Sequence, residues 1–440
     1  MSALLLRGRV LSFRTKPESI DDRAAYAFDE DGGVLVRDGR IVATGGFDAL
    51  AAQAADAEVI DHRPHLILPG FIDAHVHMPQ MQVIASYGAE LLDWLNTYTF
   101  PEETKFRDTQ HGRRIARLFL DEMVRHGTTT VAAFCSVHRE STEAFFAEAL
   151  ARDMRVIAGK VMMDRNAPEA LRDTPQSGYD DTKALIGEWH GKGRLHYAIT
   201  PRFAITSSPE QMEMAGALAR EFPDLHIQTH LSENHAEIAL TRELYPAAAD
   251  YTDVYARYGL LGPRTLLGHS IHLSEREADA IHDAGSVAVF CPTSNLFLGS
   301  GLFDWQGNSK RAKPLRIAAA TDVGGGTNYS MLRTMDEGYK VIALQGEKIN
   351  PLASFWQITL GNAEALSLAD HVGTLAPGMD ADIVVLDARA TPAMRLRMET
   401  VETLAEELFL IQTLGDDRAV VETYVAGRKA KSALAGASAG

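Results

Sequence analysis

The sequence predicts an α/β fold: a (β/α)8 barrel of the TIM type, with a small β-sandwich domain that both chain ends form. Between residues 71 and 322, short apolar runs recur, and a longer helix-like segment follows each of them. Eight such runs over about 250 residues are typical of this barrel. Strand-like patterns without helices precede and follow that region, so the two chain ends are expected to pair as one β-domain.

The N-terminal part opens with short antiparallel strands rather than helices. Residues 3–13 alternate between apolar and polar side chains, as a strand does. Residues 34–43 contain two β-type runs around Asp38-Gly39, a dipeptide that favours a tight hairpin turn. We therefore assign residues 1–65 to the β-sandwich domain.

The middle of the chain, residues 66–371, supplies the strands and helices of the predicted barrel. Two stretches between the apolar runs, residues 209–221 and 274–284, show the spacing of helices. A doubly wound parallel sheet is the alternative, because strand number alone does not prove that a sheet closes. The eight predicted strands are residues 71–77, 128–134, 155–162, 195–202, 225–231, 264–270, 286–292 and 316–322.

The C-terminal part returns to β-structure. Residues 373–387 are typical of a turn that leads into a strand, and residues 420–427 of a further strand. Residues 372–430 therefore complete the β-sandwich domain that begins at the N-terminus. The remaining residues, 431–440, are rich in Ala, Gly and Ser, and we expect a disordered tail.

Composition and charge exclude several classes of function. The chain of 440 residues has a net charge of −16, so its surface repels phosphate backbones and anionic lipid, and we expect neither a nucleic-acid nor a membrane partner. The two cysteines, Cys135 and Cys291, lie too far apart in sequence for a CxxC site and are too few for a disulfide scaffold. No window reaches the ~20 apolar residues of a membrane span. The N-terminus does not resemble a secretory signal, and the expected compartment is the cytoplasm.

Polar residues stand at the ends of the predicted strands, where the active sites of such barrels lie. His75 and His77 end the first strand, and alternation places both imidazoles on one side, about 6–7 Å apart. Taken alone, such a pair is more often one packed and one exposed histidine. His230 ends the fifth strand and Asp322 ends the eighth, which completes a set of three nitrogens and one carboxylate.

This ligand set predicts one divalent metal ion with a position left for water. Zinc is the favoured metal and iron the less favoured one. A two-metal site usually needs a bridging carboxylate, such as a carbamylated lysine on the fourth strand. Residues 195–202 contain no lysine, so we expect one ion per chain.

Three strand-end residues are candidates for acid–base chemistry. Glu233 follows His230 by three residues and could move a proton between a metal-bound water and a ring nitrogen of a substrate. An exposed loop glutamate is the alternative. His269, at the end of the sixth strand, could orient the hydroxide or hold negative charge. Asp322 could both bind the metal and take the proton of the attacking water.

The stretch from Pro69 to His77 resembles the first metal motif of the amidohydrolase superfamily, and the resemblance covers nearly the whole chain. Within the superfamily, the chain is similar to the guanine deaminases. The motifs that carry this narrower similarity are His77-Met78-Pro79-Gln80, residues 91–103, Pro201-Arg202-Phe203, residues 230–234 and residues 291–296.

The resemblance implies a specific set of roles. It implies zinc on the four candidate ligands and proton transfer by Glu233 and Asp322. It also implies that Gln80, Arg202 and Phe203 contact a purine base. A homodimer is a further implication, for which the residues themselves carry no interface signal.

The residue types on the substrate side agree with a purine. The planar fork of Arg202 suits the O6 and N7 acceptors of guanine, and the amide of Gln80 offers both a donor and an acceptor. Phe203 and Trp94 could supply stacking faces, with residues 82–104 covering the pocket as a lid. The alternatives are a surface salt bridge for Arg202 and a packed core helix around Trp94.

The predicted reaction is the hydrolytic deamination of guanine to xanthine and ammonia, a step of purine catabolism. Metal-bound water attacks C2 of the ring while Glu233 protonates N3, and Asp322 helps to protonate the departing amino group. One alternative is a deaminase or chlorohydrolase of the same superfamily that acts on a triazine, a pterin or cytosine. Another is an inactive relative with a structural or interaction role.

Overall fold

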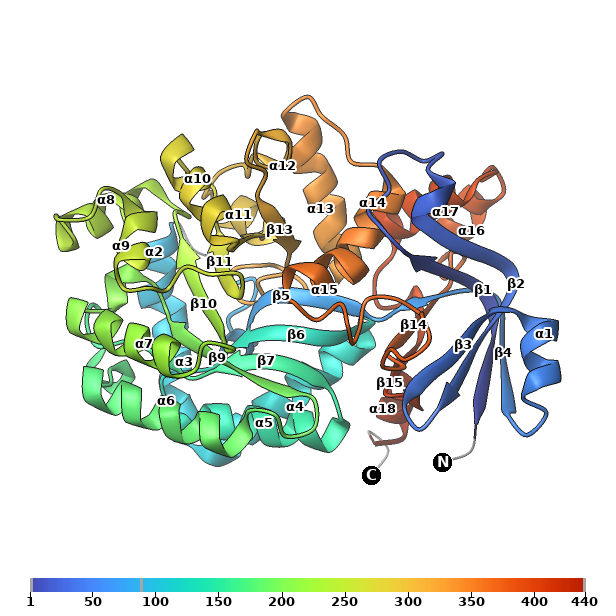
Figure 1. Cartoon of the computed structure of the whole chain (residues 1–440), viewed down its shortest axis with the longest axis horizontal. Coiled ribbons are helices and arrows are strands. Elements are labelled where there is room, and N and C mark those ends of the chain that lie inside the picture. The colour runs from blue at the N-terminus through green and yellow to red at the C-terminus, as the bar shows by residue number, and fades with distance from the viewer. Residues whose placement is uncertain (1–2, 88–89, 438–440) are drawn as a thin grey trace.

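The computed structural model describes residues 3–87 and 90–437. Its strands form a parallel barrel and a separate mixed sheet, and in Figure 1 the blue N-terminal strands lie beside the red C-terminal elements, to the right of the barrel. No helix in the described part of the chain is both long enough and apolar enough to cross a membrane.

The elements have the following bounds. The strands are β1 (Leu4–Phe13), β2 (Tyr26–Arg37), β3 (Arg40–Gly46), β4 (Glu58–Pro69), β5 (Phe71–His77), β6 (Thr128–Phe134), β7 (Arg155–Gly159), β8 (Val161–Met162), β9 (Leu195–Pro201), β10 (His226–Leu231), β11 (Thr265–His269), β12 (Val287–Phe290), β13 (Arg316–Ala319), β14 (Ile383–Leu386), β15 (Val420–Val425) and β16 (Arg428–Lys429). The α-helices are α1 (Phe47–Gln53), α2 (Leu91–Trp94), α3 (Phe100–Glu103), α4 (Thr109–Arg125), α5 (Arg139–Arg152), α6 (Pro175–Trp189), α7 (Pro209–Glu221), α8 (His235–Leu244), α9 (Tyr251–Arg257), α10 (Glu275–Ala284), α11 (Pro292–Phe297), α12 (Trp305–Lys310), α13 (Met331–Leu344), α14 (Pro351–Trp356), α15 (Asn362–Ala365), α16 (Pro392–Met398), α17 (Leu404–Leu414) and α18 (Lys431–Ala437). Tighter or wider helical turns are η1 (Arg23–Ala25), η2 (Met78–Gln80), η3 (Leu95–Thr99), η4 (Thr104–Arg107), η5 (Glu169–Leu171), η6 (Ala204–Thr206) and η7 (Gln357–Gly361).

The barrel strands follow one another around the sheet in the order β5, β6, β7, β9, β10, β11, β12 and β13, and β8 also pairs with β9. Two backbone hydrogen bonds join the last strand region to the first. Asp322 N donates to His75 O at 2.9 Å, and His77 N donates to Val323 O at 3.2 Å. The predicted α/β barrel is confirmed, and each of its eight strands overlaps a predicted apolar run.

The barrel interior is filled by one set of small and branched side chains, as is usual for this fold. They come from successive strands and include Ile72, Ala132, Ile157, Leu266 and Val289, each of them buried.

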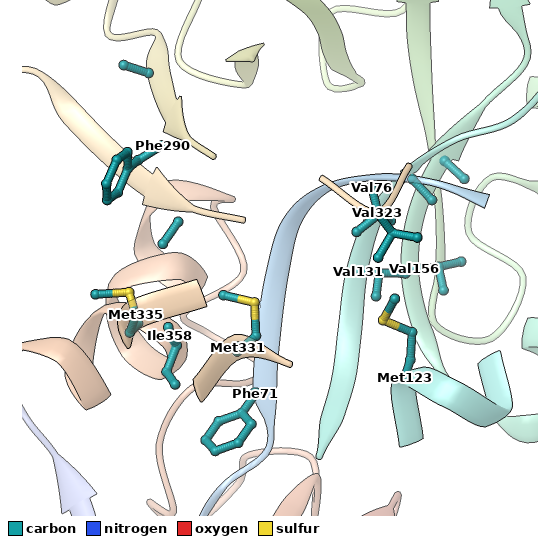
Figure 2. Packing of buried hydrophobic residues seen from close by; sticks show 14 of the residues in the cluster. Phe71, Val76, Met123, Val131, Val156, Phe290, Val323, Met331, Met335 and Ile358 are labelled. Carbon is teal, nitrogen blue, oxygen red and sulfur yellow. The ribbon is translucent and has the colours of Figure 1, made fainter. Parts of the chain in front are cut away.

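A second cluster lies between the strands and the surrounding helices. Figure 2 shows Phe71 and Val76 of β5 on this outer side, together with Met123 of α4 and Met331 of α13. Burial of such a side chain contributes roughly 1.5–3 kcal/mol. The two clusters therefore fix each strand from both faces.

The first barrel strand contains an irregularity that aims its histidines. β5 changes register against β6 between Asp73 and Val76. Before that point Ile72 belongs to the cluster inside the barrel, whereas Val76 belongs to the outer cluster although it lies an even number of residues later. A bulge re-aims the side chains that follow it. His75 and His77 consequently point into the barrel, on one side of the strand as predicted.

The second sheet joins the two chain ends in the order β16, β15, β14, β4, β1, β2 and β3. β14 is antiparallel to β4, and β1 is parallel to β4. The β-domain predicted from both ends is confirmed, with its strands hydrogen-bonded as one continuous mixed sheet. β4 runs past the expected boundary at residue 65, and the barrel begins at Phe71.

The predicted hairpin at Asp38-Gly39 is present between β2 and β3. Both turn residues have positive φ, 49° for Asp38 and 77° for Gly39. A two-residue turn of this hand matches the right-handed twist of the flanking strands, and asparagine, aspartate and glycine tolerate it best.

The C-terminal tail differs from the expectation of disorder, because Lys431–Ala437 form helix α18, whereas residues 438–440 lie outside the described part. Glu422 of β15 explains the start of this helix. Its carboxylate accepts hydrogen bonds from the backbone N–H groups of Lys431 (2.9 Å) and Ser432 (3.1 Å). An acceptor at a helix N-terminus satisfies groups that have no partner within the helix, and the alanines that follow favour helix.

Buried ion pairs fasten the end sheet to the barrel. Asp380, which precedes β14, accepts hydrogen bonds from Arg155 at 2.7 Å and from Arg194 at 3.1 Å. Arg194 also binds Asp382 at 2.8 Å. Arg155 begins β7 and Arg194 precedes β9, so these charges sit at the end of the barrel opposite the strand-end histidines.

The substitution Asp380→Asn is expected to lower the free energy of unfolding by about 3–5 kcal/mol, because it leaves two buried guanidinium groups without their shared charge. Urea denaturation measures the effect. Asp56→Asn is the matched control, since Asp56 pairs with Arg37 at an exposed site. Equal denaturation midpoints for the two variants would contradict a fastening role for Asp380.

Candidate active site

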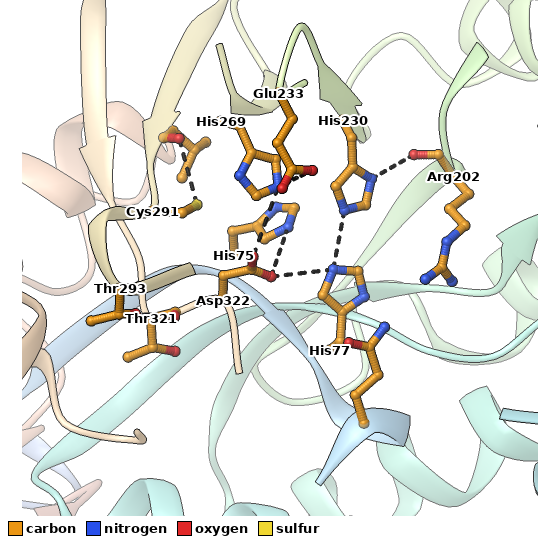
Figure 3. A network of polar contacts seen from close by, with 12 residues as sticks. His75, His77, Arg202, His230, Glu233, His269, Cys291, Thr293, Thr321 and Asp322 are labelled. Carbon is orange, nitrogen blue, oxygen red and sulfur yellow. Dashed lines mark hydrogen bonds and ion pairs between the residues drawn. The ribbon is translucent and has the colours of Figure 1, made fainter. Parts of the chain in front are cut away.

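The polar residues predicted at the strand ends meet at one mouth of the barrel (Figure 3). His77 Nε2 lies 3.1 Å from His230 Nε2. Asp322 Oδ1 lies 3.5 Å from His75 Nε2 and 3.4 Å from His77 Nε2. β5, β10 and the turn after β13 thus bring all four predicted metal ligands around one point.

The protonation of the histidines suits a metal ion. Burial lowers the pKa of His75, His77 and His230, so their imidazoles are neutral near pH 7. His230 Nδ1 donates to Arg202 O at 2.7 Å, which leaves a lone pair on the inward Nε2. His75 Nε2 is buried and has no hydrogen-bond partner among the described residues. The ligand atoms form two overlapping groups in which all atoms lie within 4.8 Å of one another, one of His75, His77 and Asp322 and one of His75, His230 and His269. Nitrogen and carboxylate donors of this kind fit zinc or another divalent ion.

Two carboxylates in this site differ sharply in their environments. Burial raises the pKa of Glu233 to about 7, although the nearby His269 opposes the rise. Burial alone would raise the pKa of Asp322, but the 3.5 Å contact with His75 Nε2 and the nearby His269 outweigh burial and lower this pKa to about 2. At neutral pH, Asp322 is therefore ionised while Glu233 is poised to exchange a proton.

His269 lies between the two carboxylates. Its Nε2 is 3.3 Å from Glu233 Oε2 and 3.8 Å from Asp322 Oδ2, and its Nδ1 pairs with Asn295 Oδ1 at 2.9 Å. Burial alone lowers the pKa of His269, but these carboxylates raise it above the ordinary value. Ser300 Oγ donates to the other Glu233 oxygen at 3.0 Å.

The backbone is strained where these side chains leave it. Ser232, His269 and Asp322 have φ values of 48°, 66° and 50°. Residues with a Cβ rarely adopt this left-handed region, and such strain clusters at functional sites. The hydrogen bond from Asp322 N to His75 O helps to hold the strained turn.

A pocket opens above this cluster, and both polar and apolar side chains line it. Trp94 and Leu91 of α2 and Leu95 of η3 form part of its wall, so the segment predicted as a lid does contact the pocket. Trp94 is also packed in a hydrophobic cluster and is only 2% exposed. The lining residues are His77, Gln80, Leu91, Trp94, Leu95, Arg202, Phe203, His230, Glu233, His269, Leu298, Asp322 and Gly325.

Arg202 is not the surface ion pair that stood as its alternative. It is 3% exposed, and its Nη1 binds both oxygens of Glu103, at 3.0 and 2.9 Å. Its guanidinium carbon lies 5.6 Å from the ring centroid of Phe100. Gln80 Nε2 donates to Glu103 Oε1 at 2.9 Å. Glu103 therefore holds Gln80 and Arg202, two polar residues of the pocket wall.

The glycines after Asp322 make room for that wall. Gly324 has a φ of 123°, and a Cβ added there would lie 2.0 Å from Gln80 Oε1. A Cβ on Gly326 would lie 1.8 Å from Thr321 O. Any larger residue would displace either the amide of Gln80 or the turn that carries Asp322.

Sequence reasoning missed four contributors to the site. Glu103 and Asn295 stood inside recognised motifs, but nothing in those motifs distinguished them from their neighbours. Ser300 lies in a loop without a pattern. Phe134 ends β6 and packs against three histidine rings, with centroid distances of 4.8 Å to His75, 4.7 Å to His77 and 4.9 Å to His230. Its position at a strand end was the available signal.

Comparisons with known proteins identify the family to which the chain is similar. The family model described as the amidohydrolase family matches residues 66–430, and one described as the imidazolonepropionase-like composite domain of bacteria matches residues 32–57. The chain is 46% identical to the guanine deaminase of Escherichia coli (strain K12) over 415 residues, which cover 94% of this chain and 93% of that protein.

Two solved structures resemble this one over nearly their whole length. For E. coli guanine deaminase, the TM-score is 0.94 with 44% identity, covering 97% of this chain and 99% of that chain. For guanine deaminase from C. acetobutylicum with bound guanine in the active site, the TM-score is 0.87 with 29% identity, and the coverage is again 97% and 99%.

The cluster is expected to bind one divalent ion per chain, and His230→Ala is expected to weaken that binding by at least about tenfold because it removes an inward lone pair. Titration of Zn²⁺ into chelator-treated protein, followed by calorimetry, measures both quantities. His126→Ala is the control, since His126 follows α4 and is remote from the cluster. Unchanged affinity in the His230 variant would exclude it as a ligand.

Proposed function

The chain belongs to the amidohydrolase family and, within it, to the guanine deaminases, and from that premise we propose how its barrel mouth hydrolyses guanine to xanthine and ammonia. The observation that carries the proposal is the meeting of residues from β5, β9, β10, β11 and the turn after β13 in the lining of one pocket. Each of these residues has a chemical task that the reaction requires.

His75, His77, His230 and Asp322 are proposed to hold one zinc ion. Members of this family generally use a divalent metal, and three neutral imidazoles with one carboxylate suit zinc better than iron. When bound, the ion lowers the pKa of a water molecule and so supplies hydroxide near neutral pH.

The purine is proposed to lie between the aromatic and polar walls of the pocket. Trp94 and Phe203 offer faces for stacking, while Gln80 and Arg202 meet the polar edge of the ring. The relative from C. acetobutylicum, which is described with guanine in its active site, supports a purine base as the ligand. Leu91 and its neighbours in the lid segment exclude water from the bound ring.

Glu233 is proposed as the group that moves protons during the reaction. With a pKa near 7, it can accept a proton from the attacking water and deliver it to N3 as the oxygen adds to C2. His269, beside Glu233 and Asp322, stabilises the negative charge that develops. Asp322 then assists proton transfer to the amino group, which leaves as ammonia while C2 becomes the carbonyl of xanthine.

The metabolic role, the oligomeric state and the cellular compartment stay predictions from the sequence. A role in purine catabolism follows from the reaction itself, and the homodimer and the cytoplasmic compartment remain expectations. The alternative is a deaminase or chlorohydrolase of the same superfamily that acts on another heterocycle, such as a triazine, a pterin or cytosine.

Zinc-loaded protein is expected to release ammonia from guanine and to leave adenine and cytosine unchanged. Of these three bases, only guanine carries an amino group at C2, next to the ring edge that Gln80 and Arg202 are proposed to bind. A coupled ammonia assay across these bases, a pterin and an aminotriazine makes the comparison. Release from another ring but not from guanine would assign the site to that substrate instead.

Glu233→Gln is expected to lower kcat by roughly 10²- to 10⁴-fold while the bound metal is retained, because the amide cannot exchange a proton. Steady-state kinetics and metal analysis of the same preparation test this. Glu243→Gln, an exposed substitution on α8, is the matched control. Full turnover in the metal-loaded Glu233 variant would assign the proton transfer to another group.

A further inference from the structure

Glu103 is a buried carboxylate that lies behind the pocket rather than in its lining. It ends α3, is 1% exposed, and its backbone carbonyl accepts a hydrogen bond from Ser136 Oγ at 3.2 Å. Its side chain accepts from Gln80 and from Arg202, both of which line the pocket. The carboxylate thus acts on two polar residues of the pocket lining without lining the pocket itself.

The first consequence is the orientation of the Gln80 amide. A carboxylate in an ion pair with arginine has acceptors and no donor, so only the NH₂ group of Gln80 can point toward it. The amide oxygen is then directed away from Glu103, against Gly324, where no Cβ intervenes. Within the described residues, no donor is bonded to this oxygen. It is therefore available to accept from a ligand.

The second consequence concerns Arg202. Both of its bonds to Glu103 use Nη1, at 3.0 and 2.9 Å. Its Nη2 and Nε groups have no acceptor among the described side chains, and its guanidinium carbon lies over the ring of Phe100. Arg202 therefore offers fixed donors next to the fixed acceptor of Gln80. Figure 3 shows Arg202 and Glu233 on either side of His230, so these groups would meet opposite edges of a ring above the cluster.

We propose that Glu103 is a positioning residue that sets the hydrogen-bond polarity of the pocket, so that it selects purines with a 6-oxo, N1–H edge. Such an edge presents an acceptor, O6, to Arg202 and a donor, N1–H, to Gln80 Oε1. A 6-aminopurine presents the reverse, with a donor at C6 and an acceptor at N1. This selection of 6-oxopurines rests on the proposed function, because it places the amino group at C2 over the four proposed metal ligands.

2,6-Diaminopurine separates this inference from the proposed reaction. It carries the same amino group at C2 as guanine, but the polarity at N1 and C6 is inverted. The native enzyme is expected to prefer guanine strongly, because buried groups that cannot pair with the wrong edge reject it. Ammonia release from each base gives kcat/KM for both substrates.

In Glu103→Gln, the uncharged amide can donate as well as accept, so the Gln80 amide can turn and Arg202 loses its anchor. We expect kcat/KM for guanine to fall about tenfold to a hundredfold, mainly through KM, while the preference for guanine over 2,6-diaminopurine narrows by about tenfold or more. Metal content and melting temperature are measured alongside. Gln80→Leu removes the acceptor directly and is expected to narrow the same preference, which keeps the test decisive if the Glu103 variant fails to fold.

Glu102→Gln is the matched control, because Glu102 is the adjacent buried glutamate and pairs with Lys105 outside the pocket. Its substrate preference is expected to equal that of the native enzyme. An equal loss for both purines in Glu103→Gln, or an unchanged preference in Gln80→Leu, would overturn the role in selection and leave the deaminase assignment intact. Failure of the native enzyme on guanine would instead overturn the proposed function.

Discussion

Closure of the barrel between β13 and β5 is the constraint on which the site depends. The hydrogen bond from Asp322 N to His75 O joins segments that are distant in sequence, and it does so at the point where both side chains turn inward. The register change in β5 aims His75 and His77 at the same centre. Because each strand is packed from both faces, the fold itself holds the proposed metal ligands in place.

Burial then gives these residues different chemistry. Removal from water keeps the imidazoles of His75, His77 and His230 neutral, as metal binding would require. The same burial leaves Glu233 near its midpoint at neutral pH, whereas contact with His75 keeps Asp322 ionised. Two carboxylates in one pocket thereby differ in protonation at neutral pH, and the proposed reaction uses this difference.

The polar wall of the pocket, formed by Gln80 and Arg202, depends on a contact between the segment that follows β5 and the end of β9. Glu103 comes from the former and Arg202 from the latter, and their ion pair also orients Gln80. A break in this contact would leave a buried charge unpaired, so the wall is expected to form as one unit. The pocket is consequently shaped by a residue that does not line it.

The sequence by itself determined the strand runs, the composite domain at the chain ends and the polar residues at the strand ends, because these follow from periodicity and from the fixed location of sites in such barrels. It could not reveal the partner of Arg202, the orientation of the Gln80 amide or the contact of Phe134 with three histidine rings. It also missed helix α18, whose first turn is held by Glu422 from another strand. Only the tertiary structure decided these features, because each is a contact between side chains that are distant in sequence. The local sequence pattern predicts which way a side chain faces, but not which distant side chain it meets.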